Sequence, residues 1–447
     1  MVSRPAPRAP SRAVTNGASE TGGGGHRLAR TIGVPGAVLL GLGSIVGTGI
    51  FVSLGVAAGV AGPSVLAAVA LAAGVATLNG LSSAELAASH AVSGGTYEYG
   101  YRYVSPAAGF LAGWMFLCAK SASAATAALG FAGYALTSFG IRGDALRVAL
   151  GVAAVASVTA LVAGGIERSS RANAIVVSLT LLTLGAFVAA GLPAALAGAP
   201  DHLCPFFGGE DGAGALLHGT ALMFVAFTGY GRVATLGEEV RDPERSIPRA
   251  IGITLLASLA LYLMVGFVAV AAVGPVALAR ATEAAAAPLE VAARGFGVPG
   301  VAWWVAAGAV TAMLGVLLNL ILGLSRVWLA MARRGDAPRG LAYVAEDGSP
   351  RRAVLWTGLL VCGLALSGSV RLTWSFSAFT VLVYYALTNL AALRLPPDAR
   401  RYPRAIPAAG LLACLGLAFW VEARIWGTGV ILAAAGLAWH AWRRRTP

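Results

Sequence analysis

Long apolar segments separated by short polar stretches dominate the chain from residue 31 onward. Each is close to 20 residues long or longer and carries few charges, which is the length an α-helix needs to cross a bilayer. The pattern predicts an all-α membrane protein with twelve transmembrane helices, at approximately 31–60, 64–89, 104–136, 145–164, 172–192, 214–236, 248–273, 300–332, 353–369, 372–393, 405–421 and 425–442. Residues 1–30 contain no apolar run, so we expect a disordered tail there.

The first apolar segment is interrupted by glycine and hydroxyl residues. Residues 41–51 read GLGSIVGTGIF, and four glycines around Ser44 and Thr48 weaken a helix and allow it to open. Opened backbone inside a bilayer persists only where protein or a polar cavity satisfies it. The N–H groups that begin the second half-helix would suit a carboxylate. The alternative is that these glycines only let neighbouring helices approach closely.

The sixth apolar segment contains a similar interruption, at residues 227–232 (FTGYGR). Two broken helices in corresponding positions of the two halves are typical of a transporter built from inverted repeats, with its site at mid-depth. We therefore expect both segments to be unwound, near residues 44–49 and 228–231, and to face each other. No residue-level repeat relates the two halves, so this expectation depends on the pattern of interruptions.

The charge distribution predicts the orientation in the membrane. The net charge of +13 is compatible with nucleic-acid binding, but 23 of the 32 basic residues fall in the tails and cytoplasmic loops if the N-terminus is cytoplasmic. That asymmetry follows the positive-inside rule, so we expect a multi-pass protein of the cytoplasmic membrane with both termini inside and no nucleic-acid partner. The four cysteines and five histidines are scattered, so we expect no metal site, no disulfide framework and no cofactor.

Four motifs resemble those of the amino acid–polyamine–organocation (APC) superfamily, in the family's order. Residues 43–51 (GSIVGTGIF) resemble its first-helix signature, and residues 93–97 (SGGTY) resemble the loop between its second and third helices. Residues 238–243 (EEVRDP) with Ile247-Pro248 resemble the stretch after its sixth helix. Residues 325–326 (SR) with 330–333 (AMAR) resemble the end of its eighth helix. Together the matches cover roughly residues 31–340.

The resemblance implies an amino acid permease with a five-plus-five inverted repeat and two peripheral helices. The ten-helix core would cover residues 31–394, with repeats at about 31–192 and 214–394, and the peripheral helices would lie within 395–447. The likeness also implies secondary transport by alternating access. It assigns the substrate α-carboxylate to the backbone of Ser44, Ile45, Val46, Gly47, Thr48 and Gly49, and the α-amine to carbonyls of Phe227, Thr228, Gly229 and Tyr230.

Lys120, in the third apolar segment, is the only lysine among the 32 basic residues. Burial lowers the pKa of a lysine and yields an amine able to exchange protons, and ionisable residues within a membrane mark functional sites. Many proton-coupled members of the superfamily carry a lysine in the fifth helix near the broken first helix, and this chain has Thr180 at that place. We therefore predict coupling to protons rather than sodium, through Lys120. One alternative is a structural lysine that snorkels or pairs with an acidic residue such as Glu85. The other is a lysine that binds a second carboxylate on an acidic substrate.

Three further charged residues are predicted to act at gates. Arg232 follows the second interruption and is expected to pair with Glu238 or Glu239, with a substrate carboxylate as the alternative partner. For Glu85 we expect a helix-packing or gate-bonding role. Arg326 ends the eighth segment and is expected to tie the cytoplasmic gate.

The leading prediction is thus an amino acid permease, proton-coupled or exchanging, in the lipid bilayer. The sequence contains no nucleophile–base pair or metal-ligand spacing, so an enzyme is not expected. One alternative is a transporter of polyamines or other organic amines. Another is an amino acid sensor that binds without transporting, which uptake into proteoliposomes would distinguish from a permease.

Overall fold

The computed structural model describes residues 32–90, 94–165, 170–207, 211–234, 240–345 and 348–445. The predicted tail at residues 1–30 lies outside the described residues. Within the described ranges the regular structure is helical and includes no β-strand. The α-helices are α1 (Val34–Ile45), α2 (Thr48–Phe51), α3 (Ser53–Ala61), α4 (Val65–Ser89), α5 (Thr96–Tyr99), α6 (Pro106–Ser138), α7 (Asp144–Ala163), α8 (Ser170–His202), α9 (Gly212–Phe227), α10 (Gly231–Ala234), α11 (Pro243–Val273), α12 (Pro275–Ala285), α13 (Pro288–Arg294), α14 (Val301–Arg334), α15 (Arg351–Ala365), α16 (Val370–Leu393), α17 (Ala405–Ala418) and α18 (Ala423–Arg445). Short 3-10 and π segments η1 (Gly62–Ser64), η2 (Gly100–Val104), η3 (Thr228–Tyr230), η4 (Arg339–Ala342) and η5 (Pro397–Ala399) complete them.

The all-helical prediction is confirmed. The described residues contain fewer candidate membrane spans than the twelve predicted. The described residues contain 9 helical stretches long and apolar enough to cross a membrane. One of them, Thr48–Ser89, covers 42 residues and includes parts of two predicted spans. α15 and α17 have 15 and 14 residues, which is shorter than the roughly 20 residues that a span requires. The count of twelve and the inverted repeat stay predictions.

Local sequence sets the ends of several long helices. Ser105, Asp211 and Ser369 each accept a hydrogen bond from the backbone N–H three residues on, at 3.2, 3.0 and 3.1 Å, so they cap α6, α9 and α16. Gly62 has a φ of 58°, which glycine adopts readily, and it turns the chain at Pro63 between α3 and α4.

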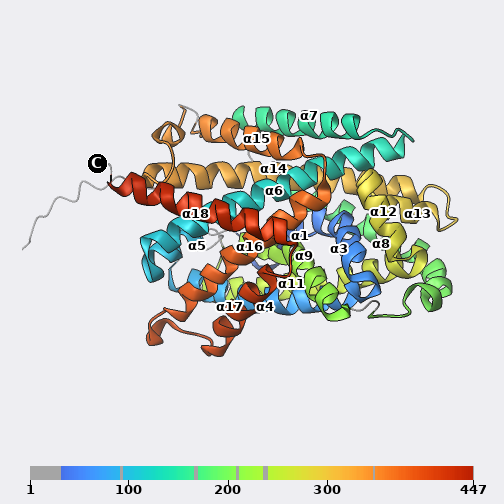
Figure 1. The fold of residues 1–447 in the computed structure, drawn as a ribbon, viewed down its shortest axis with the longest axis horizontal. Helices are drawn as coiled ribbons and strands as arrows, with labels where there is room; N and C mark the ends of the chain where they lie inside the picture. Colours follow the sequence, from blue (N-terminus) through green and yellow to red (C-terminus); the bar gives the residue numbers. More distant parts are fainter. Residues whose placement is uncertain are drawn as a thin grey trace, which may run out of the picture.

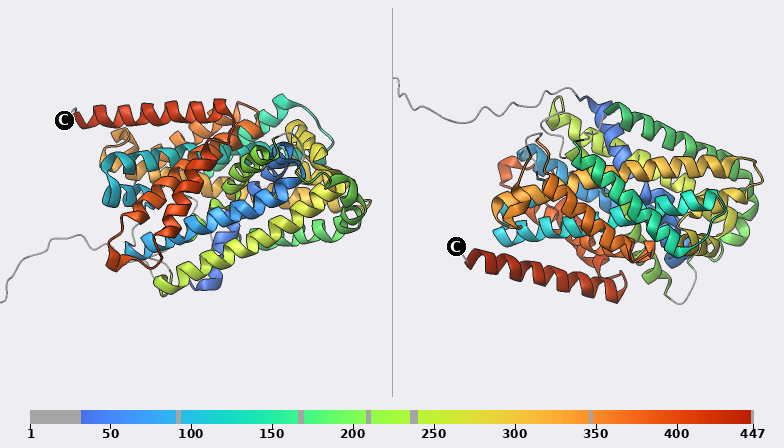
Figure 2. Two further views of the ribbon diagram at one scale, coloured as in Figure 1. Left: turned by 60° about the horizontal axis from the view of Figure 1, so that its bottom comes forward. Right: turned by 90° about the horizontal axis from the view of Figure 1, so that it is seen from above.

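The long helices run side by side, and shorter ones cover the two ends of the bundle (Figure 1). α12 and α13 lie at one end of the molecule and α5 lies at the other. α6 packs against both α14 and α16, while α1 to α3 contact α8, α9, α11 and α14. In both views of Figure 2, α18 lies along the outside of the bundle. The broken helices therefore occupy the middle of the protein.

Candidate functional site: two broken helices and a half-buried lysine

The first break lies between α1 and α2. α1 ends at Ile45 and α2 begins at Thr48, and Val46 between them has an extended backbone. Two carbonyls along this segment are satisfied by tyrosines from other helices. Tyr262 on α11 donates to the Ile45 carbonyl at 2.8 Å, and Tyr134 on α6 donates to the Phe51 carbonyl at 2.7 Å. The predicted interruption near residues 44–49 is thus present in the structure. The Ile45 and Phe51 carbonyls on either side of it find hydrogen-bond donors inside the protein, as the membrane interior requires.

The second break, between α9 and α10, is tighter than predicted. Residues Thr228–Tyr230 form one 3-10 turn rather than an unwound stretch. The Thr228 hydroxyl donates to the Val225 carbonyl at 2.8 Å, and Tyr385 on α16 donates to the Thr228 carbonyl at 3.3 Å. These bonds satisfy the turn locally, so the chain continues into α10 without an extended gap.

The two breaks face each other, as the pattern predicted. Gly229 packs directly against the Ser44 carbonyl, leaving no room there for a side chain. The Tyr262 hydroxyl reaches both segments, because it lies 2.8 Å from the Ile45 carbonyl and 3.3 Å from the Ala226 carbonyl. A tyrosine from α11 therefore holds the two broken helices together at their interruptions.

Glycine at the first break also has a packing role. A Cβ on Gly47 would lie 2.5 Å from Cγ2 of Val316 on α14. A Cβ on Gly49 would lie 2.7 Å from both Cβ of Ala226 and the hydroxyl of Tyr262. The alternative of close helix packing thus holds at these positions, although it does not exclude a substrate contact through the same backbone. The amides assigned to the substrate carboxylate stay a prediction.

Lys120 joins α6 to the second break. Its Nζ donates a hydrogen bond of 2.9 Å to the Thr228 hydroxyl. It forms no ion pair with an acidic side chain among the described residues, so the expected alternative of pairing with Glu85 is not what the structure contains. The Glu85 carboxylate instead accepts hydrogen bonds from the backbone N–H groups of Arg401 and Tyr402, at 2.5 and 3.1 Å. Lys120 therefore stands at the predicted site, next to a residue assigned to the substrate amine.

The predicted gate residues differ in their surroundings. Glu85 is 2% exposed and anchors the segment that leads into α17, which is a packing role at the end of α4. Arg232 is half-buried on α10, and its expected partners Glu238 and Glu239 lie outside the described residues. Arg326 is exposed near the end of α14 and forms no ion pair within the described ranges. The gate roles of all three stay predictions.

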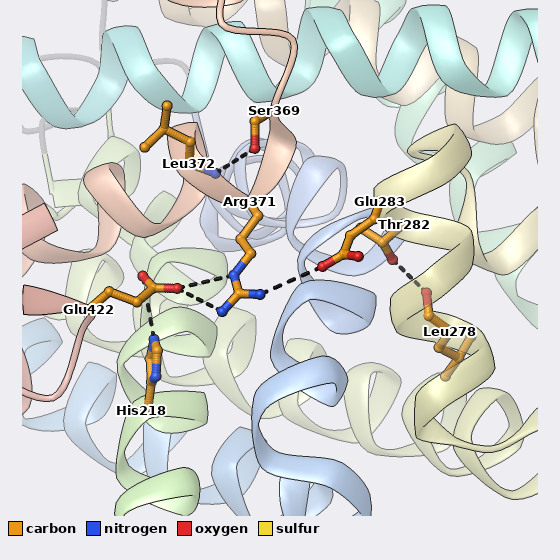
Figure 3. Close-up of polar contacts among 8 residues, drawn as sticks. All are labelled: His218, Leu278, Thr282, Glu283, Ser369, Arg371, Leu372 and Glu422. Carbon is orange, nitrogen blue, oxygen red and sulfur yellow. Dashed lines mark hydrogen bonds and ion pairs between the residues drawn. The ribbon is translucent and has the colours of Figure 1, made fainter. Parts of the chain in front are cut away.

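An ion-pair network lies on the face predicted to be outer, and the sequence reasoning did not find it. Arg371, at the start of α16, lies between Glu422 and Glu283 (Figure 3). Its guanidinium is 2.9 Å from the Glu422 carboxylate and 3.6 Å from that of Glu283 on α12. His218 on α9 approaches Glu422 to 3.8 Å. The network connects α9, α12 and α16, three elements that are far apart in the sequence.

A second network lies at the opposite end, around Asp336, which follows α14. Tyr97 and Tyr101 both donate to one carboxylate oxygen at 2.6 Å, and His440 on α18 lies 3.0 Å from the other. Burial, together with the hydrogen bond to Asp336, raises the pKa of both tyrosines above its usual value. Asp336 therefore joins the loop after α4, the end of α14 and the last helix.

Comparison with known proteins identifies the family of the chain. The family model described as amino acid permease matches residues 36–439. An uncharacterized transporter of Mycobacterium tuberculosis is 43% identical over 421 residues, which cover 93% of this chain and 92% of that protein. A branched-chain amino acid permease of Bacillus subtilis is 28% identical over 417 residues, 88% of this chain and 87% of that protein. A mitochondrial cationic amino acid transporter of Arabidopsis thaliana is 32% identical over 195 residues, 42% of this chain and 31% of that protein.

Proposed function

Because the chain belongs to the amino acid permease family, we propose that it is a secondary active transporter that moves amino acids across the cytoplasmic membrane by alternating access. It is a membrane transporter rather than an enzyme, like its relatives. The finer proposal is that the inverted repeats place one substrate site between the two breaks, with both termini in the cytoplasm. The facing of Gly229 and Ser44 is the observation that supports one shared site.

The backbone around residues 44–49 would receive the α-carboxylate, and carbonyls of residues 227–230 would receive the α-amine. N–H groups that begin a half-helix attract an anion, while carbonyls at the end of one attract a cation. A zwitterionic amino acid presents both charges, whereas a simple amine presents only one. This arrangement favours amino acids over polyamines, although the organic amine alternative is tested in the same assay.

We propose that Lys120 couples transport to protons. The carrying observation is the hydrogen bond of 2.9 Å from its Nζ to Thr228, within the second break. A protonated Lys120 donates to the Thr228 hydroxyl, whereas a neutral one holds it less strongly, so protonation changes how firmly α6 and the break are joined. Thr180 cannot titrate, and its hydroxyl bonds to the Val176 carbonyl of its own helix at 2.7 Å.

Uptake into proteoliposomes with imposed proton or sodium gradients tests this proposal. Lys120→Met is never charged and Lys120→Arg is always charged, so both should lose proton-driven accumulation while exchange is retained. Thr180→Val is the matched control, because it alters a buried polar residue on α8 without a titrating group. Sodium-driven accumulation, or unchanged proton-driven accumulation in Lys120→Met, would contradict the coupling role. A protein that binds amino acids and transports none would be a sensor.

The same variants test the second candidate role for Lys120, binding the side-chain carboxylate of an acidic amino acid. Lys120→Arg would then keep substantial uptake, because a cation remains at the site. Lys120→Met would lose affinity for acidic amino acids alone, with uptake of neutral ones preserved. The proton-coupling proposal expects the opposite pattern, in which both variants lose accumulation of every substrate.

A further inference from the structure

Residues 275–294, which comprise α12 and α13, form a lid at the predicted outer face (Figure 1). The lid is attached to the first broken helix through Tyr134 on α6. The Tyr134 hydroxyl accepts a hydrogen bond from the Leu289 N–H at 3.2 Å and donates to the Phe51 carbonyl at 2.7 Å. Thr282 of the lid packs so closely against Gly55 on α3 that no side chain would fit there. The lid therefore covers the outer half of the first broken helix.

The lid contains a buried carboxylate, Glu290, whose side chain is 1% exposed. Its Oε1 accepts hydrogen bonds from Arg294 at 2.9 Å and from the Ser138 hydroxyl at 3.3 Å. Its Oε2 is buried and has no partner among the described residues. An ionised carboxylate oxygen that is buried without a hydrogen bond is costly, so this environment disfavours the charged form.

The groups facing Glu290 do not overcome that burial. The charged and titratable side chains that act on it within the described structure are Arg294 on α13 itself and Tyr134 on α6. Burial raises the pKa of Glu290 above its usual value, and the bonds from Arg294 and Ser138 only partly offset this. The side chain of Arg294 is 48% exposed, which weakens its effect.

A cavity lies close to the carboxylate. A cavity of about 1120 Å³ borders the lid, and its lining includes Arg294, Thr137 and the exposed Arg142. Arg294 contacts Glu290 directly, while Thr137 precedes the Ser138 that hydrogen-bonds to it. Arg294 and the segment at residues 137–138 therefore lie between this cavity and Glu290.

We propose that Glu290 is a second proton-binding site of the transport cycle, which takes up a proton from the outer side when the lid closes over Tyr134. This inference depends on the proposed alternating-access function. When the lid moves away from α6, the carboxylate loses Ser138, regains water and releases its proton. Closing then binds a proton, so acid on the outer side favours the closed lid. The proton passes from water to Glu290 and back, with no covalent change in the protein.

Uptake measured against outer pH tests the proposal. Glu290→Gln mimics the protonated state, so in a Lys120→Met background, where Lys120 does not titrate, exchange should continue but lose its dependence on outer pH. Glu283→Gln is the matched control, since it removes a lid carboxylate whose side chain is 63% exposed, and it should keep the wild-type profile. Arg294→Gln removes the cation that faces Glu290, so the midpoint of the outer-pH profile should shift to higher pH, by up to about one unit. A wild-type profile in Glu290→Gln overturns the proposal, as does a midpoint that does not rise in Arg294→Gln.

A readout that does not require transport separates the two proposals. Infrared difference spectra of the purified protein should show the band of a protonated carboxyl group. This band should persist at pH values above the usual pKa of glutamate, and it should be missing in Glu290→Gln. If this band is present and no amino acid is taken up, the transport function fails and the proton site stands. If uptake is normal and the band is unchanged in Glu290→Gln, the proton site fails and the transport function stands.

Discussion

Replacing Gly47 by alanine tests how the first break is used. The added Cβ would lie 2.5 Å from Cγ2 of Val316, whereas nonbonded carbons prefer about 3.5–4.0 Å. The break and α14 must therefore move apart by about 1 Å at this point, or the Val316 side chain must leave its position, and overpacking of that kind costs about 1–3 kcal/mol. At about 1.4 kcal/mol for each factor of ten, the expected loss is about 5-fold to 150-fold in the population of the native packing.

A double-mutant cycle separates packing from substrate contact. Gly47→Ala, Val316→Ala and the double variant are compared in melting temperature, substrate affinity and uptake. If packing is the only role of Gly47, the double variant recovers both stability and affinity, because the clashing methyl is gone. If the Gly47 backbone also approaches the substrate carboxylate, stability recovers and affinity does not. Wild-type stability and uptake in Gly47→Ala alone would refute the steric reasoning.

Two further predictions concern the predicted cytoplasmic end. Glu85→Ala should lower the free energy of unfolding by about 2–3 kcal/mol, because the backbone N–H groups of residues 401–402 lose a charged acceptor. Glu85→Gln keeps an acceptor and should cost less than half as much. Thermal unfolding measures both effects. Tyr97 and Tyr101 have raised pKa values beside Asp336, so their contribution is complete below about pH 10, the usual tyrosine value, and is lost at higher pH. The melting temperature should fall above that pH, and less steeply in Tyr97→Phe; an equal slope would contradict this.

The positions of the breaks could be predicted from the sequence because glycine acts locally. Four glycines within residues 41–51 weaken a helix wherever that segment lies, so the break after Ile45 follows from the chain itself. The second break was only partly predicted. The carbonyls of the single turn at Thr228 accept hydrogen bonds from the Thr228 hydroxyl and from Tyr385. The number of glycines in the segment does not reveal that Tyr385, on another helix, is a partner.

The partners of the breaks could not be predicted, because they come from distant helices. Tyr134 and Phe51 are 83 residues apart, and Tyr262 and Ile45 are 217 residues apart. In the sequence of an apolar helix, a tyrosine that bonds a distant carbonyl cannot be told from one that only packs. The sequence of neither helix encodes how deep the two helices lie relative to each other. The different partners of Lys120 and Glu85 could not be predicted for the same reason, because the partner of each depends on how the helices are placed.

The single lysine also makes one side chain of the protein selectively reactive toward amine reagents. Reagents that acylate amines have only two targets in this chain, the N-terminal amine and Lys120, since every other basic side chain apart from histidine is an arginine. Lys120 is half-buried against Thr228, so under the proposed alternating access a reagent would reach it from the side that is open. Its rate of acylation, read by mass spectrometry, would report the accessibility of the central site from either side of the membrane. A bound substrate would slow that reaction without any label being introduced into the protein.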